Sequence, residues 1–255
     1  PKTFSPEEIN AHFEGMPPRY FQIHDARAVA RDLTLAHRFM HLQLTEDDRA
    51  LEPALLWGDE PDRGCSGVHI CTWDRAGLFA KLTGSLAAAG LNILGAQIYT
   101  RADDIVLDDF FVVDARTGKL PEPAVRQRFE RIVADVLARG LDPAKALAKV
   151  QRYAPLYRAS GETIPTAVRI DNETSETCTV IDVEAEDRVG LLFELAQAMY
   201  DVGLNVVLAR IVTEKGAAID SFYVTGRDRK KVVDPERRRA IERRIREVVG
   251  QQAVV

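Results

Sequence analysis

Two short segments combine an acid, an arginine and a glycine in an order suited to binding a small charged molecule. Asp74-Arg75-Ala76-Gly77-Leu78 returns 113 positions later as Asp187-Arg188-Val189-Gly190-Leu191. Each segment joins a strand-like stretch to a helical one, so backbone N–H groups and the positive end of a helix are offered to an anion. Glycine permits close backbone approach, and a free amino acid carries a suitable carboxylate. Alternatively, the glycine only makes the turn and the acid only caps the helix.

An asparagine follows each of these segments at the same spacing. Gly90-Leu91-Asn92-Ile93 returns as Gly203-Leu204-Asn205-Val206. An asparagine amide offers donors and an acceptor together, which suits the ammonium and carboxylate groups of an amino acid. The alternative is an asparagine that bonds only to its own backbone in a turn.

The histidines give a weaker indication of chemistry. His24-Asp25 spells the HD dipeptide of metal phosphohydrolases, but no second histidine and facing aspartate accompany it, and Asp25 is explained as a helix cap. His37 and His41 lie one helical turn apart without the acid of an H-E-x-x-H motif. There is also no Walker loop and no G-x-S-x-G motif. We therefore predict no catalytic residue and no metal ligand in this chain.

Composition excludes several classes of function. The 255 residues include 34 basic and 39 acidic side chains, for a net charge of −5, so no overall field draws the chain to nucleic acid or anionic lipid. Arginines 237–239, 243, 244 and 246 alternate with glutamates, which is typical of a solvated helix face. No apolar run is long enough to span a membrane, and the first residues lack a signal-peptide core. Three cysteines without C-x-x-C spacing indicate a reducing, cytoplasmic setting.

The two acidic turns belong to a larger internal repeat. Residues 74–100 and 187–213 share 11 identities in 27 aligned positions, so two copies of one small domain are predicted. Each copy shows the order β–β–α–β–β–α, an α+β unit with a four-stranded antiparallel sheet and helices on one face. The expected strands are 54–57, 68–73, 92–100 and 106–114, then 167–170, 179–184, 205–213 and 218–225; the expected helices are 76–89, 121–139, 189–202 and 234–249.

Residues outside the repeat complete the predicted organisation. We expect a helical N-terminal segment over 1–48, domains over 49–140 and 165–255, and a helix and linker over 141–164 between them. The two domains should pack side by side, because each leaves a sheet edge that needs cover, with the acidic turns near the shared interface. A start at Pro1 suggests a fragment or a processed product.

The repeated motifs resemble those of tandem ACT domains, small ferredoxin-like modules that bind amino acids and regulate attached enzymes. These motifs are D-R-x-G-L, G-L-N-[IV] and the strand D-x-F-[FY]-V, at Asp108 and Asp220. The second copy and the segment Met16–Phe21 are similar to the C-terminal region of bifunctional protein-PII uridylyltransferase/uridylyl-removing enzymes. Ala76 and Val189 depart from the proline usual in the family. Because proline would pre-set the first helical turn, we expect its loss to make each ligand pocket less rigid.

The resemblance implies a regulatory, non-catalytic module that senses glutamine. Its partners are then the catalytic domains of a longer enzyme and, through them, the PII protein. Mg²⁺ is expected only in those catalytic domains. For this chain we expect no cofactor, nucleic acid or membrane as a partner, and homodimer formation stays open. An ACT repeat that binds another amino acid, or acts as an interaction scaffold, is the alternative; an independent metal enzyme built on His24-Asp25 is a third reading. The predicted ligand-binding residues are Trp73, Asp74, Arg75, Gly77, Leu78, Asn92, Asp187, Arg188, Gly190, Leu191 and Asn205.

Overall fold

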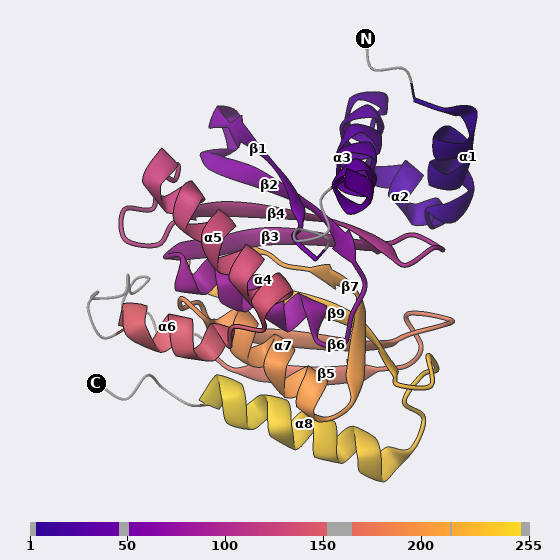
Figure 1. Ribbon diagram of the computed structural model, residues 1–255. Coiled ribbons are helices and arrows are strands. Elements are labelled where there is room, and N and C mark those ends of the chain that lie inside the picture. The colour runs from indigo at the N-terminus through magenta and orange to yellow at the C-terminus, as the bar shows by residue number, and fades with distance from the viewer. Residues whose placement is uncertain (1–3, 46–50, 152–164, 215, 251–255) are drawn as a thin grey trace.

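The computed structural model describes residues 4–45, 51–151, 165–214 and 216–250. It consists of two α+β units that lie against each other, with a bundle of three helices on the far side of the first unit (Figure 1). The predicted boundaries at 48/49 and 164/165 fall in or beside residues outside the described ranges, so they stay predictions.

The first copy has the predicted order of elements. Its sheet has the strand order β1-β2-β4-β3 with every neighbouring pair antiparallel, and its two helices cover one face (Figure 1). The elements are β1 (Ala54–Glu60), β2 (Cys65–Trp73), α4 (Leu78–Ala88), β3 (Leu91–Thr100), β4 (Ile105–Asp114) and α5 (Pro123–Arg139), with a short 3-10 turn η2 (Pro61–Arg63) in the first hairpin.

The second copy repeats this topology after helix α6 (Pro143–Gln151). Its strand order is β5-β6-β9-β7, and a two-residue strand β8 also pairs with β9. The elements are β5 (Ala167–Asp171), β6 (Thr179–Glu186), α7 (Leu191–Asp201), β7 (Leu204–Arg210), β8 (Thr213–Glu214), β9 (Ala217–Gly226) and α8 (Pro235–Gly250). The predicted fold class is confirmed. The strand expected over 205–213 is wrong in detail, because it stops at Arg210 and resumes as β8.

The two copies agree even in an irregularity. The pairing of β3 with β4 shifts register between Ile93 and Gly95, and that of β7 with β9 shifts between Val206 and Leu208, at the same offset of 113 residues. A bulge of this kind re-aims the side chains around it. Strands β3 and β7, which carry the repeated asparagine as their second residue, are therefore irregular at the same point.

The two units share one hydrophobic core. Strands β3 and β7 lie edge to edge, and helices α4 and α7 pack on each other on the same side (Figure 1). Phe79 of α4 meets Phe222 of β9 edge-on, with ring centroids 6.4 Å apart. A Cβ added to Gly84 of α4 would come within 2.7 Å of the Phe193 ring of α7. The predicted side-by-side arrangement is confirmed.

The N-terminal segment covers the opposite face of the first sheet. It comprises α1 (Pro6–Gly15), α2 (Pro18–Ile23) and α3 (Ala26–Thr45), and the short helix α2 was not predicted. Helix α1 begins with a capping box in which Ser5 and Glu8 bond to each other's backbone N–H. Tyr20 and Phe39 are fully buried in a second core with strand residues of the first copy.

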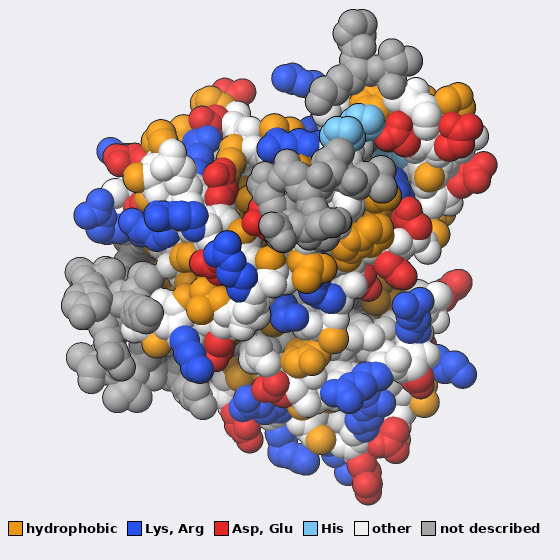
Figure 2. Space-filling model, in the orientation of Figure 1, with side chains coloured by type: hydrophobic (Ala, Val, Ile, Leu, Met, Phe, Trp, Pro, Cys, Tyr) orange, Lys and Arg blue, Asp and Glu red, His pale blue; other side chains and the backbone are white. Residues whose placement is uncertain are grey.

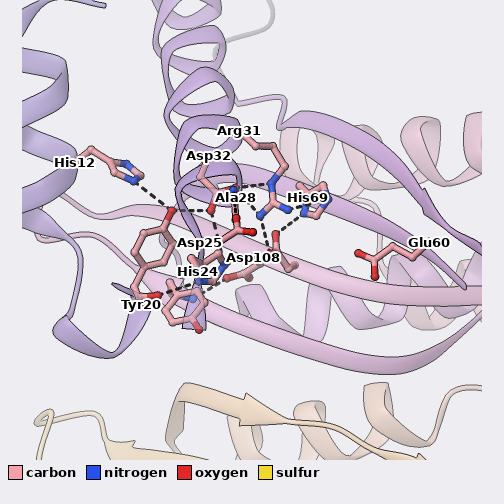
Figure 3. A network of polar contacts seen from close by, with 12 residues as sticks. His12, Tyr20, His24, Asp25, Ala28, Arg31, Asp32, Glu60, His69 and Asp108 are labelled. Carbon is pink, nitrogen blue, oxygen red and sulfur yellow. Dashed lines mark hydrogen bonds and ion pairs between the residues drawn. The ribbon is translucent and has the colours of Figure 1, made fainter. Parts of the chain in front are cut away.

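Within this second core lies a network of buried polar groups (Figure 3). The carboxylate of Asp109 accepts hydrogen bonds from His69 Nδ1 at 2.6 Å and from an Arg31 Nη at 2.9 Å. Arg31 also donates to Asp32 at 2.8 Å, and the Tyr20 hydroxyl donates to the other oxygen of Asp32 at 2.8 Å. Burial by itself raises the pKa of Asp109, but hydrogen bonds from histidines and the nearby cations outweigh it, so this pKa lies well below its usual range.

His24 and Asp25 take part in this packing. The Asp25 side chain accepts from the backbone N–H of Ala28 at 2.8 Å, as a helix cap does. The His24 ring stacks on Tyr20 and lies 3.4 Å from Asp109. Among the described residues, no group of three or more His, Cys, Asp or Glu side chains is placed to hold a metal ion.

Replacing Arg31 by methionine should destabilise the docked N-terminal segment. The change keeps most of the apolar stem but leaves two buried carboxylates, Asp32 and Asp109, without the cation between them. Removing one partner of a buried ion pair costs about 3–5 kcal/mol, and the partial exposure of Arg31 reduces this to about 2–4 kcal/mol. Urea unfolding measures the difference. Arg27→Met on the exposed side of the same helix is the matched control, and equal losses in both variants would contradict the network's role.

Candidate ligand sites between the two repeats

The first acidic turn joins β2 to α4 around a left-handed glycine. Gly77 has φ of 70° and occupies the N-cap of α4 without any side-chain cap. Asp74 therefore does not cap the helix; its backbone N–H is bonded to Asp104 O at 2.7 Å instead. The N–H of Leu78, the first helical residue, is bonded to Arg75 O at 3.0 Å, but no side chain caps the helix. The N–H groups that follow and the positive end of the dipole are therefore available to a ligand carboxylate.

The second acidic turn has the same geometry. Gly190 has φ of 92° at the N-cap of α7, again without a side-chain cap. The backbone N–H of Asp187 is bonded to Gly216 O at 2.9 Å. Because helices α4 and α7 begin after the glycines, positions 76 and 189 lie before the first helical residue. The expected effect of losing proline there on the rigidity of each ligand pocket stays a prediction.

Each turn faces the asparagine of the other copy. The turn at Asp74 and Asn205 line one cavity, which we call the first site. The turn at Asp187 and Asn92 line another, which we call the second site. This exchange follows from the pseudo-twofold packing of α4 on α7 and β3 beside β7. Neither site is complete within one copy.

The two sites differ greatly in size. The first site is a cavity of about 700 Å³, whereas the second encloses about 20 Å³. The larger value lies within the range of small-molecule sites, and the smaller one suffices for about one water. The polar and aromatic residues around the first site include Asp74, Arg75, Arg101, Asp104, Asp108, Tyr200, Asn205, Thr225, Arg227 and Arg229.

The arginines of the turns hold the local structure. Arg75 donates to the carbonyl of Leu137 at the end of α5 at 2.9 Å and to Thr72 at 3.3 Å. Arg188 forms a two-pronged ion pair with Glu194 of α7, and the hydrogen bonds to Glu194 raise its pKa although burial opposes the shift. Both guanidinium groups line the cavities and are bonded to the protein itself.

Trp73 alone among the predicted residues is placed away from both sites. Its indole N–H donates to Gln43 at 3.2 Å, and its ring meets Phe39 of the N-terminal segment. Leu78 and Leu191 line their sites, but their side chains are buried, and their backbone N–H groups are bonded to the carbonyls of Arg75 and Arg188 at 3.0 Å. The prediction that Trp73 binds ligand is not supported by this geometry, because successive strand residues point to opposite faces.

Comparison with known proteins agrees with this architecture. Residues 167–255 match the family described as "ACR9-like, ACT-like domain". The chain is 34% identical over 224 residues to the bifunctional uridylyltransferase/uridylyl-removing enzyme of Rhodospirillum rubrum, covering 86% of this chain and 24% of that enzyme. The enzyme of the same name from Azospirillum brasilense is 34% identical over 223 residues, covering 87% and 23%.

This chain contains a tandem pair of ACT domains. Its resemblance to uridylyltransferase/uridylyl-removing enzymes is confirmed, and the chain spans about a quarter of the length of these relatives. Among solved structures, it is similar to aspartate kinase from Synechocystis with a TM-score of 0.38 and 16% identity, over 75% of this chain and 28% of that one. Within the described residues, no helix is both long and apolar enough to cross a membrane.

Two buried acids of the ACT pair were missed as site residues. Asp108 on β4 lines the first site and Asp220 on β9 lines the second, and both are at most 2% exposed. Asp108 accepts from the backbone N–H of Tyr99 at 3.2 Å, whereas Asp220 Oδ1 has no partner among the described residues. The D-x-F motif shared by both copies was the available signal, since an acid at an inward strand position is unusual.

The surface of the ACT pair shows no concentration of one charge on the face seen in Figure 2. Acidic and basic side chains are mixed across it, including over α8. Arg246 pairs with Glu242 at 2.8 Å, and Arg244 lies 3.7 Å from Asp201. The arginines of this helix thus alternate with acids in space as well as in sequence.

Asp220→Asn should stabilise the ACT pair at high pH. Burial raises the pKa of Asp220 to about 7, so the wild-type protein loses stability as pH rises from about 4 through 7. Asparagine cannot ionise, so its advantage should be small at pH 4.5 and reach roughly 2–4 kcal/mol at pH 8. Urea unfolding at both pH values measures this, with the exposed Glu184→Gln as control. An advantage that is the same at both pH values would contradict an ionising, buried Asp220.

Proposed function

We propose that this ACT pair is the regulatory module of a cytoplasmic uridylyltransferase/uridylyl-removing enzyme and that it senses free glutamine at the first site. The observation that carries the proposal is the open cavity between the copies, in which an uncapped helix start, an amide and acids converge. Similarity to enzymes of that name over most of the chain supports the regulatory role. Catalysis then resides in a part of the protein outside this chain.

The groups around the first site suit the two charged ends of an amino acid. The carboxylate approaches the turn at Gly77, where no side chain caps the helix and the helix dipole is positive. The exposed amide of Asn205 reaches the same cavity from the second copy and can bond to either ligand group. The ring of Tyr200 lies over the turn, 3.4 Å from where a Cβ on Gly77 would be. The ligand is therefore held between the copies, and its binding energy acts on their interface.

Ligand binding at this interface provides a route to regulation. A ligand that contacts both copies favours the arrangement in which the two sides of the first site have the right separation. The wall of this site includes Arg101, whose side chain packs on Gly15 at the end of α1. The backbone N–H of Ala102 also donates to Gly15 O at 3.0 Å. The N-terminal segment thus contacts the wall of the ligand cavity directly. We propose that ligand binding shifts the position of this segment and thereby changes the activity of the catalytic part toward the PII protein.

Glutamine should raise the thermal midpoint of the chain. Selective binding to the folded state contributes about 2.7 kcal/mol at a hundredfold excess over the dissociation constant. Thermal unfolding with increasing glutamine, and with other amino acids for comparison, measures the effect. A shift for another amino acid but none for glutamine would instead assign the site to that amino acid, and no shift for any would favour an interaction scaffold.

Asn205→Ala should weaken glutamine binding without unfolding the chain. The side chain is exposed at the cavity, so its loss removes ligand hydrogen bonds worth roughly 0.5–3 kcal/mol and little native structure. Isothermal titration gives the dissociation constant. Gln127→Ala, which removes an exposed amide from α5, is the control, and equal affinity in both variants would place the ligand elsewhere.

A further inference from the structure

The second site has the same acidic turn and asparagine as the first, but its cavity is far smaller. The turn at Asp187 corresponds to the turn at Asp74, and Asn92 to Asn205, at the constant offset of 113. If the turn and the asparagine alone decided binding, both sites would accept a ligand. The volumes of about 20 and 700 Å³ show that neighbouring residues decide it instead.

An aromatic residue fills part of the space at the second site. Phe193 lines the second site, whereas its counterpart at the first site is Ala80. Phe193 is 7% exposed, and its ring lies beside the bare backbone of Gly84, which also adjoins Pro143 of α6. Gly84 is required there, because a Cβ would come within 2.7 Å of the ring and 2.8 Å of Pro143. A side chain of this size is therefore fixed beside the second turn by elements on two sides.

A hydrogen bond between the copies closes the same site. Asn92 Nδ2 donates to Asp187 Oδ2 at 3.0 Å, so the asparagine that would bind a ligand is bonded to the turn. At the first site both counterparts, Asp74 and Asn205, are exposed to solvent. Asn92 and Asp187 thus bond to each other across the interface, and a ligand would have to break this bond in order to reach them.

We infer that the second site is a closed clasp between the two ACT domains and that the chain binds one amino acid, at the first site alone. Phe193 and the Asn92–Asp187 hydrogen bond are the elements that exclude a second ligand. The inference rests on the proposed function for the identity of the ligand, but the closure itself is a property of the free chain. The clasp holds α4 against α7 whether or not a ligand is present, so the first site is already formed before a ligand binds.

Titration calorimetry with glutamine tests the stoichiometry. The wild-type chain should bind one equivalent, and Asn92→Ala should keep its affinity within about twofold, whereas Asn205→Ala should lose about tenfold or more. Phe193→Ala should admit a second equivalent, and Phe193→Leu serves if the alanine variant does not fold. Two equivalents in the wild type, or matching losses in both asparagine variants, would overturn the inference and leave glutamine sensing intact.

A measurement without ligand separates the clasp from the proposed function. Asn92→Ala should lower the urea midpoint of the free chain, because it leaves Asp187 without the amide, and Asn205→Ala should leave the midpoint unchanged. If no amino acid binds, glutamine sensing fails while this comparison still tests the clasp. Equal midpoints for both variants would overturn the clasp whatever binds at the first site.

Discussion

The packing of helix α4 on α7, with strand β3 beside β7, is the contact on which the rest of the structure depends. It buries apolar surface from both copies in one core, so neither copy's helices face water on that side. It also brings each acidic turn opposite the asparagine of the other copy. Because the sites are made by the contact, a ligand at the first site and the stability of the pair are thermodynamically linked.

Strand β4 connects the ligand cavity with the N-terminal segment. Its side chains alternate between the two faces of the sheet, so the consecutive residues Asp108 and Asp109 have opposite surroundings. Asp108 lines the first site, while Asp109 accepts the bonds of Arg31 and His69 on the other face. Because one strand carries both acids and the interior is close-packed, a displacement of β4 at the first site should also displace Asp109 on the other face of the sheet.

Sequence patterns predicted nearly all strands and helices and the pairing of copies, because period-two and helical spacings together with a repeated glycine are local signals. They located Gly77 and Gly190, whose left-handed backbone does not depend on neighbours. They did not predict that each turn takes the asparagine of the other copy, because that depends on how two domains dock. They also did not indicate where the Trp73 ring lies, because its position next to Asp74 in sequence does not decide the face of the sheet. The closeness of Phe193 to Gly84 depends on packing between the copies, which no motif records.

The buried acid of the open site limits which ligand groups it can bind. Burial raises the pKa of Asp108 well above its ordinary value, opposed only partly by the hydrogen bond from the Tyr99 N–H. Its carboxyl group therefore takes up a proton more readily than an exposed acid does, and in the protonated form it donates a hydrogen bond, which suits a ligand oxygen better than an ammonium group. Asp74 at the rim is exposed, where water supports its charge. An amino acid in this site should accordingly direct its ammonium group toward the rim and its oxygen atoms inward, toward α4 and Asp108.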